Sequence, residues 1–262
     1  MGSATTQALA ASNAALAAAS GVDLGVAGEL FAAGRALADV PQLSGALSDH
    51  GASITAREKV VADVFGSLSA TTRSVLGTVV AQRWSRASDL VDTVEELAIR
   101  AAASSEPSAD VERELFQFSR VVAGDAQLEL ALGGRLGDPA AKGALVDALL
   151  KDRVSQATAL IAASIVQRPR ERRVRELLGR AEGIVAAQRG RAVATVTSAV
   201  ALSEAQTKRI ATMLTAKYDT TVSVNTVVDP TLVGGLRVQI ADDVIDASIA
   251  SRLTDLRQRL AG

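Results

Sequence analysis

The stretch that decides the fold of the C-terminal part lies at residues 222–248 and reads VSVNTVVDPTLVGGLRVQIADDVIDAS. On both sides of a central break its apolar residues alternate with polar neighbours: Val222, Val224, Val228, Leu236, Val238 and Ile240. This period of two is typical of half-buried strands. Within the break, Pro230 cannot donate to a β-ladder, and the Gly234-Gly235 pair permits positive φ or close backbone approach. The stretch therefore predicts two strands joined at Asp229 to Gly235.

The flanking sequence supplies the other elements of a small α+β domain. Residues 191–200 alternate as an earlier strand, and Ser203 to Gln206 form a capping box that opens a helix. Asp242-Asp243 suits a tight turn before a short apolar return. From Ser248 the apolar period becomes helical, with Ile249, Leu253, Leu256 and Leu260 on one face. The order strand, helix, strand, strand, helix predicts a C-terminal α+β domain at residues 191–262.

The rest of the chain has the apolar periodicity of helices. Residues 4–19 predict an Ala-rich leading helix, and capping signals follow at Thr55 to Glu58 and at Ser69. Residues 104–108 read SSEPS and break the pattern, so they are predicted as a linker. The fold class is therefore mainly α with a small α+β C-terminal domain.

The helical region repeats itself at an offset of about 85 residues. Glu29-Leu30-Phe31 with Arg35 matches Glu114-Leu115-Phe116 with Arg120. Further matches stay in register: Gln42-Leu43 with Gln127-Leu128, Asp63 with Asp147, Ser69 with Ser155, and Gln82-Arg83 with Gln167-Arg168. We therefore predict an internal duplication, with a first bundle at residues 1–105 and a second at residues 106–190. Phe31 and Phe116 are predicted to be equivalent core residues.

Composition excludes several classes of function. The 262 residues carry 28 basic and 29 acidic side chains, which gives a net charge of −1, so the whole molecule is not suited to a polyanion. Only 2% of residues are aromatic, which removes the usual platforms for stacking bases. The chain has no cysteine, so disulfides and thiolate metal sites are excluded. No run of 18 apolar residues exists, and we expect no membrane span.

A search for catalytic, cofactor or metal sites finds none. Gly133 to Gly137 comes nearest to a phosphate loop, but Lys142 is followed by glycine and no strand clearly precedes it, so a loop between helices is predicted. His50 is the only histidine and is expected at the surface. The acids Asp242, Asp243 and Asp246 do not follow a calcium-loop pattern. We predict that the protein is not an enzyme.

An arginine cluster at residues 168–191 leaves alternatives open. Residues 151–191 hold ten basic and four acidic side chains. A solvated helix face or contacts between bundles would explain them, and so would a docking face for an acidic partner helix. A helical-repeat protein that binds a ligand or nucleic acid through these arginines is the alternative function.

Residues 228–253, VDPTLVGGLRVQIADDVIDASIASRL, closely resemble the C-terminal signature of the ATP synthase delta subunit family, the bacterial relatives of the oligomycin-sensitivity-conferring protein. The family signature rests on Asp229, Pro230, Gly234, Gly235 and Asp246. Ordinary members carry one N-terminal bundle joined directly to the small C-terminal domain. The duplicated bundle of this chain resembles that of some actinobacterial members.

The resemblance implies a non-catalytic connector in the F-type, proton-translocating ATP synthase, without cofactor, metal or nucleic acid. It implies that the N-terminal bundle binds the N-terminal helices of the alpha subunits and that the C-terminal domain binds a b-type subunit of the peripheral stalk. The protein would lie at the cytoplasmic face of the plasma membrane, attached only through the complex. Candidate groove residues for an alpha-subunit helix lie on the first bundle, and some of them must instead face the bundle core: Leu9, Leu16, Val75, Leu76, Val79, Val80 and, at the end of the helix, Trp84.

Overall fold

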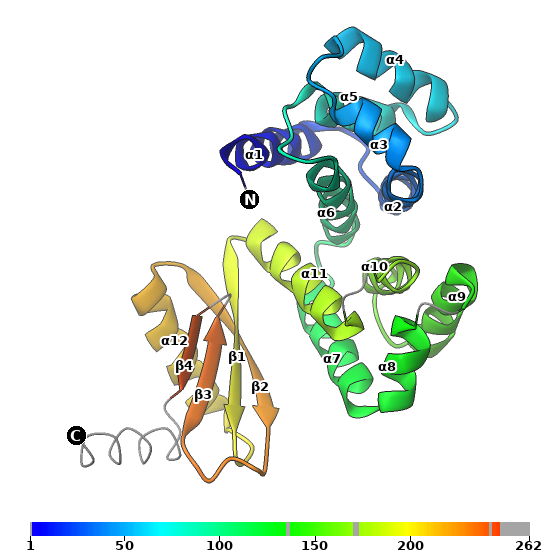
Figure 1. Ribbon diagram of the computed structural model, residues 1–262. Coiled ribbons are helices and arrows are strands. Elements are labelled where there is room, and N and C mark those ends of the chain that lie inside the picture. Colours follow the sequence, from blue (N-terminus) through cyan, green and yellow to red (C-terminus); the bar gives the residue numbers. More distant parts are fainter. Residues whose placement is uncertain (1, 135–136, 170–172, 241–242, 247–262) are drawn as a thin grey trace, which may run out of the picture. The chain divides into compact units, whose positions relative to one another are not determined.

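The computed structural model describes residues 2–134, 137–169, 173–240 and 243–246. It divides the chain into two compact units, residues 1–181 and residues 182–262. The first unit is built from helices, and the second contains a sheet (Figure 1). The expected fold class, mainly α with a small α+β unit at the C-terminus, is confirmed.

The region predicted as the first bundle, residues 1–105, contains six helices in chain order: α1 (Ser3–Ala18), α2 (Leu24–Asp39), α3 (Pro41–Ser48), α4 (Ile54–Val64), α5 (Ala70–Ala81) and α6 (Ala87–Ser105). Asp23 caps α2, Ser53 caps α4 and Ser69 caps α5, each by accepting a hydrogen bond from a backbone N–H of the first turn. The cap at Ser69 was predicted. The capping signal at Thr55 was wrong by two residues, because Ser53 lies in extended backbone just before the helix and Thr55 is already inside it.

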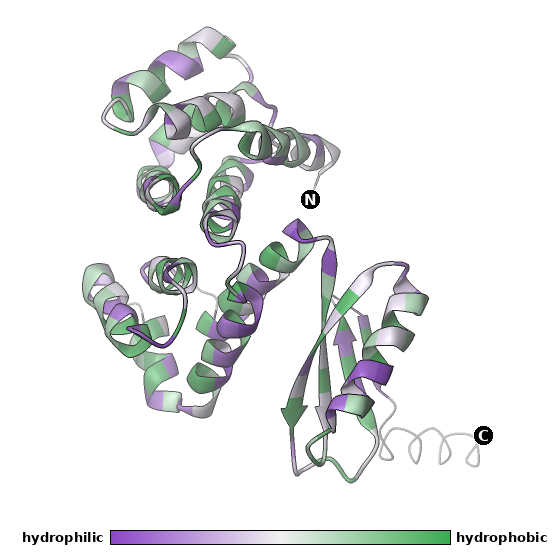
Figure 2. Cartoon of the chain, turned by 180° about the vertical axis from the view of Figure 1, so that it is seen from behind, coloured by the Kyte–Doolittle hydropathy of each residue, from purple (hydrophilic) through white to green (hydrophobic). Residues whose placement is uncertain are grey.

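The second bundle continues with α7 (Val111–Gly124), α8 (Ala126–Gly133), α9 (Pro139–Leu150), α10 (Gln156–Val166) and α11 (Val174–Gln188). Asp110, Asp125, Asp138 and Ser155 cap the first four of these helices. Figure 2 shows hydrophobic and hydrophilic residues along the helices of both bundles, as expected for amphipathic helices. The boundary between the two compact units falls within α11.

The second unit contains β1 (Arg191–Ser198), α12 (Glu204–Tyr218), β2 (Thr221–Val228), β3 (Leu236–Ile240) and β4 (Asp243–Asp246). The strand order is β2-β1-β3-β4; β1 pairs parallel with β2 and antiparallel with β3. A capping box of Ser203 and Gln206 opens α12, as predicted. One face of the sheet and α12 form the core of this unit, which contains Ala194, Val196, Ile210, Leu214, Val222, Val238 and Ile240. The predicted final helix, from Ser248, lies outside the described residues.

Candidate helix-docking surface

The side chains predicted to line a helix-binding groove lie mostly in the core of the first bundle. Six of them expose 5% or less of their surface: Leu16, Val75, Leu76, Val79, Val80 and Trp84. The indole Nε1 of Trp84 donates to the carbonyl oxygen of Val79 at 2.9 Å, which holds the ring inside the bundle. We therefore correct the expectation that these six present groove surface. Their helical spacing marks the face that packs against neighbouring helices, and Leu9 alone of the predicted set is partly accessible.

Helix α1 packs against α5 and α6, and polar contacts hold it at both ends. Near its start, the hydroxyl of Thr5 donates to Asp89 of α6 at 2.7 Å and accepts from the backbone N–H of Ser85 at 3.2 Å. Just after its end, the carbonyl oxygen of Ser20 accepts from the hydroxyl of Thr71 at 3.2 Å. The α1–α5 pair is therefore a fixed surface rather than a loosely attached leading helix.

Partly accessible side chains follow one stripe of α5. Thr71 and Thr78 are spaced by seven residues, so they lie on the same face of the helix, and Gln82 follows directly after its end. Arg73 and Ser74 are exposed and line a groove of about 590 Å³ between α4 and α5, and Thr78 lines this groove as well. The stripe and the Arg73 groove therefore meet at Thr78, and both are places on α5 where another chain can reach the first bundle.

Each bundle contains a partly buried glutamate whose carboxylate accepts several hydrogen bonds, and the two glutamates lie at matching positions. We call each of these a carboxylate network. In the first, the carboxylate of Glu29 accepts from the backbone N–H and hydroxyl of Ser69 and from the hydroxyl of Thr72, at 2.5–3.1 Å. In the second, Glu114 accepts from the equivalent groups of Ser155 and Thr158 at 2.6–3.0 Å. Sequence analysis matched Glu29 with Glu114 and Ser69 with Ser155, but it did not predict that these pairs touch.

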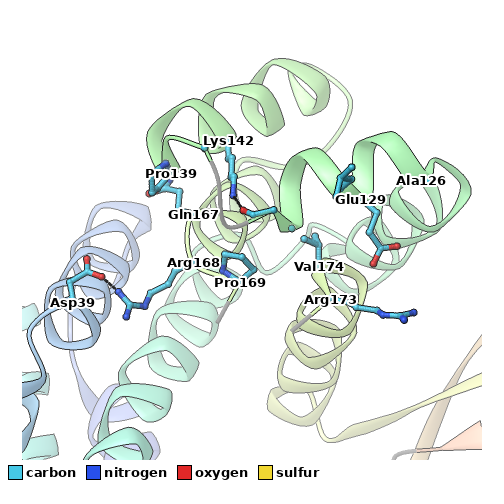
Figure 3. A pocket seen from close by; sticks show the side chains of 14 residues that line it. Asp39, Ala126, Glu129, Pro139, Lys142, Gln167, Arg168, Pro169, Arg173 and Val174 are labelled. Carbon is cyan, nitrogen blue, oxygen red and sulfur yellow. Dashed lines mark hydrogen bonds and ion pairs between the residues drawn. The ribbon is translucent and has the colours of Figure 1, made fainter. Parts of the chain in front are cut away.

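A groove of about 1090 Å³ lies in the second bundle beside the glycine-rich loop (Figure 3). Lys142 of α9 donates from Nζ to the carbonyl oxygen of Gly134, so its ammonium is engaged with the loop backbone. This loop connects helix α8 to helix α9, whereas a phosphate loop follows a strand. The prediction of a connection between bundle helices is confirmed. Arg135 and Leu136 lie outside the described residues.

Arg168 connects the second bundle to the first (Figure 3). Its Nη2 donates to the carbonyl oxygen of Ala38 at 2.7 Å, and its guanidinium forms an ion pair with Asp39. Both acceptors lie at the C-terminal end of α2, where helix carbonyls concentrate partial negative charge. Of the alternatives considered for the arginine cluster, a contact between bundles therefore applies to Arg168. Arg170 and Arg172 lie outside the described residues.

The signature residues of the C-terminal unit form a turn and an ion pair. The carboxylate of Asp229 accepts from the backbone N–H and hydroxyl of Thr231 at 3.0 and 2.7 Å, and these hydrogen bonds lower the pKa of Asp229. Gly234 and Gly235 have φ values of 148° and 83°, a region that favours glycine. Asp246 of β4 pairs with Arg237 of β3 at 3.1 Å. Pro230 is exposed between these groups. These residues shape the β2–β3 connection and its neighbouring strand pair.

Within the described part of the chain, no group of three or more His, Cys, Asp or Glu side chains could hold a metal ion. Among the same residues, no helix is both long enough and apolar enough to cross a membrane. His50 is exposed, as predicted. The surface features that these residues provide are the α1–α5 face, the groove beside the glycine-rich loop and the sheet of the second unit.

Comparisons with known proteins identify relatives along the whole length. The family described as ATP synthase delta (OSCP) subunit matches residues 96–260. The protein named ATP synthase subunit delta from Leifsonia xyli is 47% identical and is covered, like this chain, over its full length. Proteins of the same name from Nocardia farcinica and Streptomyces avermitilis are 40% and 38% identical. The comparison with the Nocardia farcinica protein covers 89% of this chain and 88% of the relative, and that with the Streptomyces avermitilis protein covers 82% and 81%. The resemblance drawn from residues 228–253 is thereby confirmed.

Proposed function

Because the chain belongs to the ATP synthase delta (OSCP) subunit family, we propose that it is a stator subunit that connects the catalytic head of an F-type ATP synthase to its peripheral stalk. The family is that of a structural, non-catalytic subunit of the complex. The observation that carries the proposal is the match to the Leifsonia xyli protein over the full length of both chains. A similarity confined to one domain would not support a role that needs both ends of the molecule.

The mechanical role requires two separate binding surfaces rather than a reactive site. Rotation of the rotor applies torque to the head, and the head would turn with it unless a connector transmits the opposing force to the stalk. A connector of this kind needs one part that binds the head and another that binds the stalk. The two compact units, residues 1–181 and residues 182–262, support this division.

For the head, we propose that an alpha-subunit N-terminal helix docks on the α1–α5 face. This surface offers Leu9 and the stripe of Thr71, Thr78 and Gln82, above a core that contains the six buried residues first assigned to the groove. A helix that docks in a groove uses anchors at i, i+3, i+4 and i+7. The buried residues support the surface, and the accessible ones would contact the partner.

For the stalk, we propose that a b-type subunit binds the C-terminal domain, residues 191–262. Val228 and Val244, on the two outer strands β2 and β4, expose 48% and 58% of their surface and offer apolar contacts. The subunit would then lie at the cytoplasmic face of the plasma membrane and be held there only by the complex. A nucleic-acid function through the arginine cluster finds no support at Arg168, which binds the end of α2.

The proposal is tested by purification of the tagged full-length chain from its own cells. We expect the alpha and beta subunits and a b-type subunit to co-purify at fixed stoichiometry. A matched variant with Leu9→Arg and Thr78→Arg should lose the alpha and beta subunits and retain the b-type subunit. Recovery of the wild-type chain without any ATP synthase subunit, from membranes that contain an intact complex, would contradict the proposal.

A further inference from the structure

The two bundles have the same helix order, and one helix belongs to both. Helices α2 to α6 begin 85–87 residues before α7 to α11 and follow one another in the same order. In the same way α1, which begins 84 residues before α6, precedes α2 as α6 precedes α7. The buried positions of α1 are Thr5, Ala8, Ser12 and Leu16, and residues 86 positions later in α6 are also buried: Val91, Val94, Ala98 and Ala102. Helix α6 is therefore the last helix of the first bundle and the leading helix of the second.

The contacts of α6 in the second bundle repeat those of α1 in the first. Helix α6 packs against α10 as α1 packs against α5. After α1, Ser20 receives a hydrogen bond from Thr71 at the start of α5. After α6, the carboxylate of Glu106 receives one from the backbone N–H of Ala157 at the start of α10, at 2.7 Å. Both pairs are separated by the 86-residue offset, so the α6–α10 face is the structural equivalent of the α1–α5 face.

The α6–α10 face is already occupied by the chain's own helix α2. Helix α2 packs against both α6 and α10. Phe31, Gly34 and Arg35 of α2 meet Glu95 of α6 and a stripe of α10, and the cavity left between them is only about 20 Å³, room for roughly one water molecule. Ser164 and Ile165 of α10 and Arg168, just after the end of α10, line this junction. Arg168 fixes the end of α2 through Ala38 and Asp39.

The equivalent positions on the first bundle are not covered. Subtracting 86 from Glu95 and Ser164 leads to Leu9 and Thr78, and the sequence match pairs Arg168 with Arg83, which is exposed. Ser164 exposes only 7% of its surface, and Ala157, at the start of the same stripe, exposes none, whereas Thr78 and Thr71 are partly accessible. The surface between the two helices is therefore covered by α2 in the second bundle, and the equivalent surface of the first bundle is open.

Helix α2 and its equivalent α7 also differ in how deeply their matching residues are buried. Phe31 of α2 is buried at 5% exposure, but its equivalent Phe116 of α7 is only half-buried. Arg35 is half-buried, with Nη1 lacking a hydrogen-bond partner within the described residues and with its pKa lowered by burial; its equivalent Arg120 is exposed. The α2 face is covered because α10 packs on it, and no further bundle in the described chain packs on α7. The expectation that Phe116 is a core residue is thus wrong.

We use the word seat for the helix-docking surface formed by α1 and α5 in the first bundle and by α6 and α10 in the second. We propose that the seat of the second bundle is closed because α2 fills it. The protein then offers one open seat for a partner helix, on α1 and α5. The inference rests on the proposed function for the identity of the partner. It matters because the family match begins at residue 96, within α6, so the bundle that aligns with the ordinary family domain is the second one. Alignment alone would place the head-binding site on the bundle whose seat is filled.

Helix α2 also indicates the chemistry of the missing occupant. It presents Phe31 and, one turn later, Gly34, which comes close to Val94 and to the backbone of Glu95 on α6. The space between α6 and α10 is narrow, and Ser164 and Ile165 line it beside Glu95, so it fits a helix that offers one bulky apolar anchor followed by a small residue. An amphipathic helix of a partner subunit meets this description. A second copy of the chain, presenting its Phe116 face head to tail, is the competing occupant.

The first experiment counts the seats on the full-length chain. Isothermal titration with a synthetic peptide of the alpha subunit's N-terminal helix should give one peptide per chain. Leu9→Arg, which lies outside the α4–α5 groove, should weaken binding at least tenfold, whereas the control Arg73→Glu, inside that groove, should change it less than twofold. Two peptides per chain, or undiminished binding to the Leu9→Arg protein, would overturn the inference.

The second experiment tests the closed seat without any partner. Because the chain has no cysteine, the pair Asp39→Cys and Arg168→Cys can be joined by a short bismaleimide in the full-length protein. We expect rapid crosslinking, with peptide affinity and stoichiometry unchanged, while the control pair Asp39→Cys and Arg120→Cys should not link. Failure of the first pair to link, or a loss of peptide binding on linking, would overturn the closed seat.

The two experiments separate the possible failures. If the pair links but no peptide binds, the closed seat stands and the proposed head-binding function fails. If sedimentation instead shows concentration-dependent oligomers that Leu9→Arg abolishes, the open seat takes a second copy of the chain, and the partner-helix inference is overturned.

Discussion

The first and second bundles share their helix order and their carboxylate network, yet they bury different residues. Phe31 is in the core and Phe116 is not, although the two occupy the same place in their bundles. The difference comes from the neighbour: α2 has α10 packed against it, and α7 has no equivalent helix in the described chain. In a tandem array, the burial of a position depends on where its repeat stands in the order as well as on the repeat's own sequence.

The same comparison applies to the turn before the last helix of each bundle. In the first bundle, Trp84 exposes 2% of its surface and fills the space after α5. Arg57 nearby donates to the carbonyl oxygen of Gln82 at 3.2 Å. In the second bundle, Lys142 takes the place of Arg57, and a groove of about 1090 Å³ lies beside it. The first bundle therefore has a large buried aromatic side chain at this turn, and the second bundle has an open groove there.

The largest expected difference concerns the two phenylalanines. Phe31→Ala should lower the free energy of unfolding by about 3–5 kcal/mol, because it leaves a cavity where α2 meets α10. Phe116→Ala should cost only about 1–2 kcal/mol, because the side chain already contacts solvent. Urea unfolding of the full-length variants, followed by far-UV circular dichroism, measures both. Equal losses would show that the second bundle's outer face is covered in solution.

The carboxylate networks should instead behave alike. Glu29→Gln and Glu114→Gln should each cost about 1–3 kcal/mol, because the donors at the start of α5 or α10 lose a charged acceptor. The same urea titration compares the two variants, and the exposed change Glu58→Gln serves as the control. If one of the two substitutions left the free energy of unfolding unchanged, the networks would not be equivalent. The duplication would then lose its best structural support.

The network also predicts a dependence on pH. Desolvation by burial raises the pKa of Glu29, but the hydrogen bonds from Ser69 and Thr72 outweigh it and lower the pKa below the ordinary value of 4.5. A folded-state pKa below the unfolded value stabilises the protein above about pH 4.5, and this contribution is lost as the pH falls through the folded-state value. Thermal unfolding across this range should show the loss in the wild type and a smaller slope in Glu29→Gln. An identical slope in both proteins would assign the acid sensitivity elsewhere.

The smallest expected effect is that of the ion pair between the bundles. The side chains of Arg168 and Asp39 expose 32% and 65% of their surface, so solvent screens the attraction. A double-mutant cycle with Arg168→Ala and Asp39→Ala should give a coupling energy of no more than about 1 kcal/mol. Tight apolar packing of α2 on α10 would then hold the two bundles together. A coupling of several kcal/mol would instead make Arg168 the main connection.

The sequence by itself determined the elements and their order. Alternation in residues 222–240 led to strands because side chains on a strand point to opposite faces, and the matches between Glu29 and Glu114 and between Ser69 and Ser155 led to equivalent helices. These signals are local: a cap, a turn or a period acts within a few residues of its own position. They also led to the family, because the signature lies in one uninterrupted stretch.

The tertiary structure alone decided which apolar face is core and which is surface. Periodicity shows that Val75 and Val79 share a side of α5, but it cannot show whether a helix of the same chain or of a partner covers that side. The double role of α6 and the filling of the second seat by α2 depend on contacts between residues more than 50 positions apart, such as Glu106 with Ala157. Burial is a property of the assembled neighbours, and a repeated sequence acquires different surfaces when its copies have different neighbours.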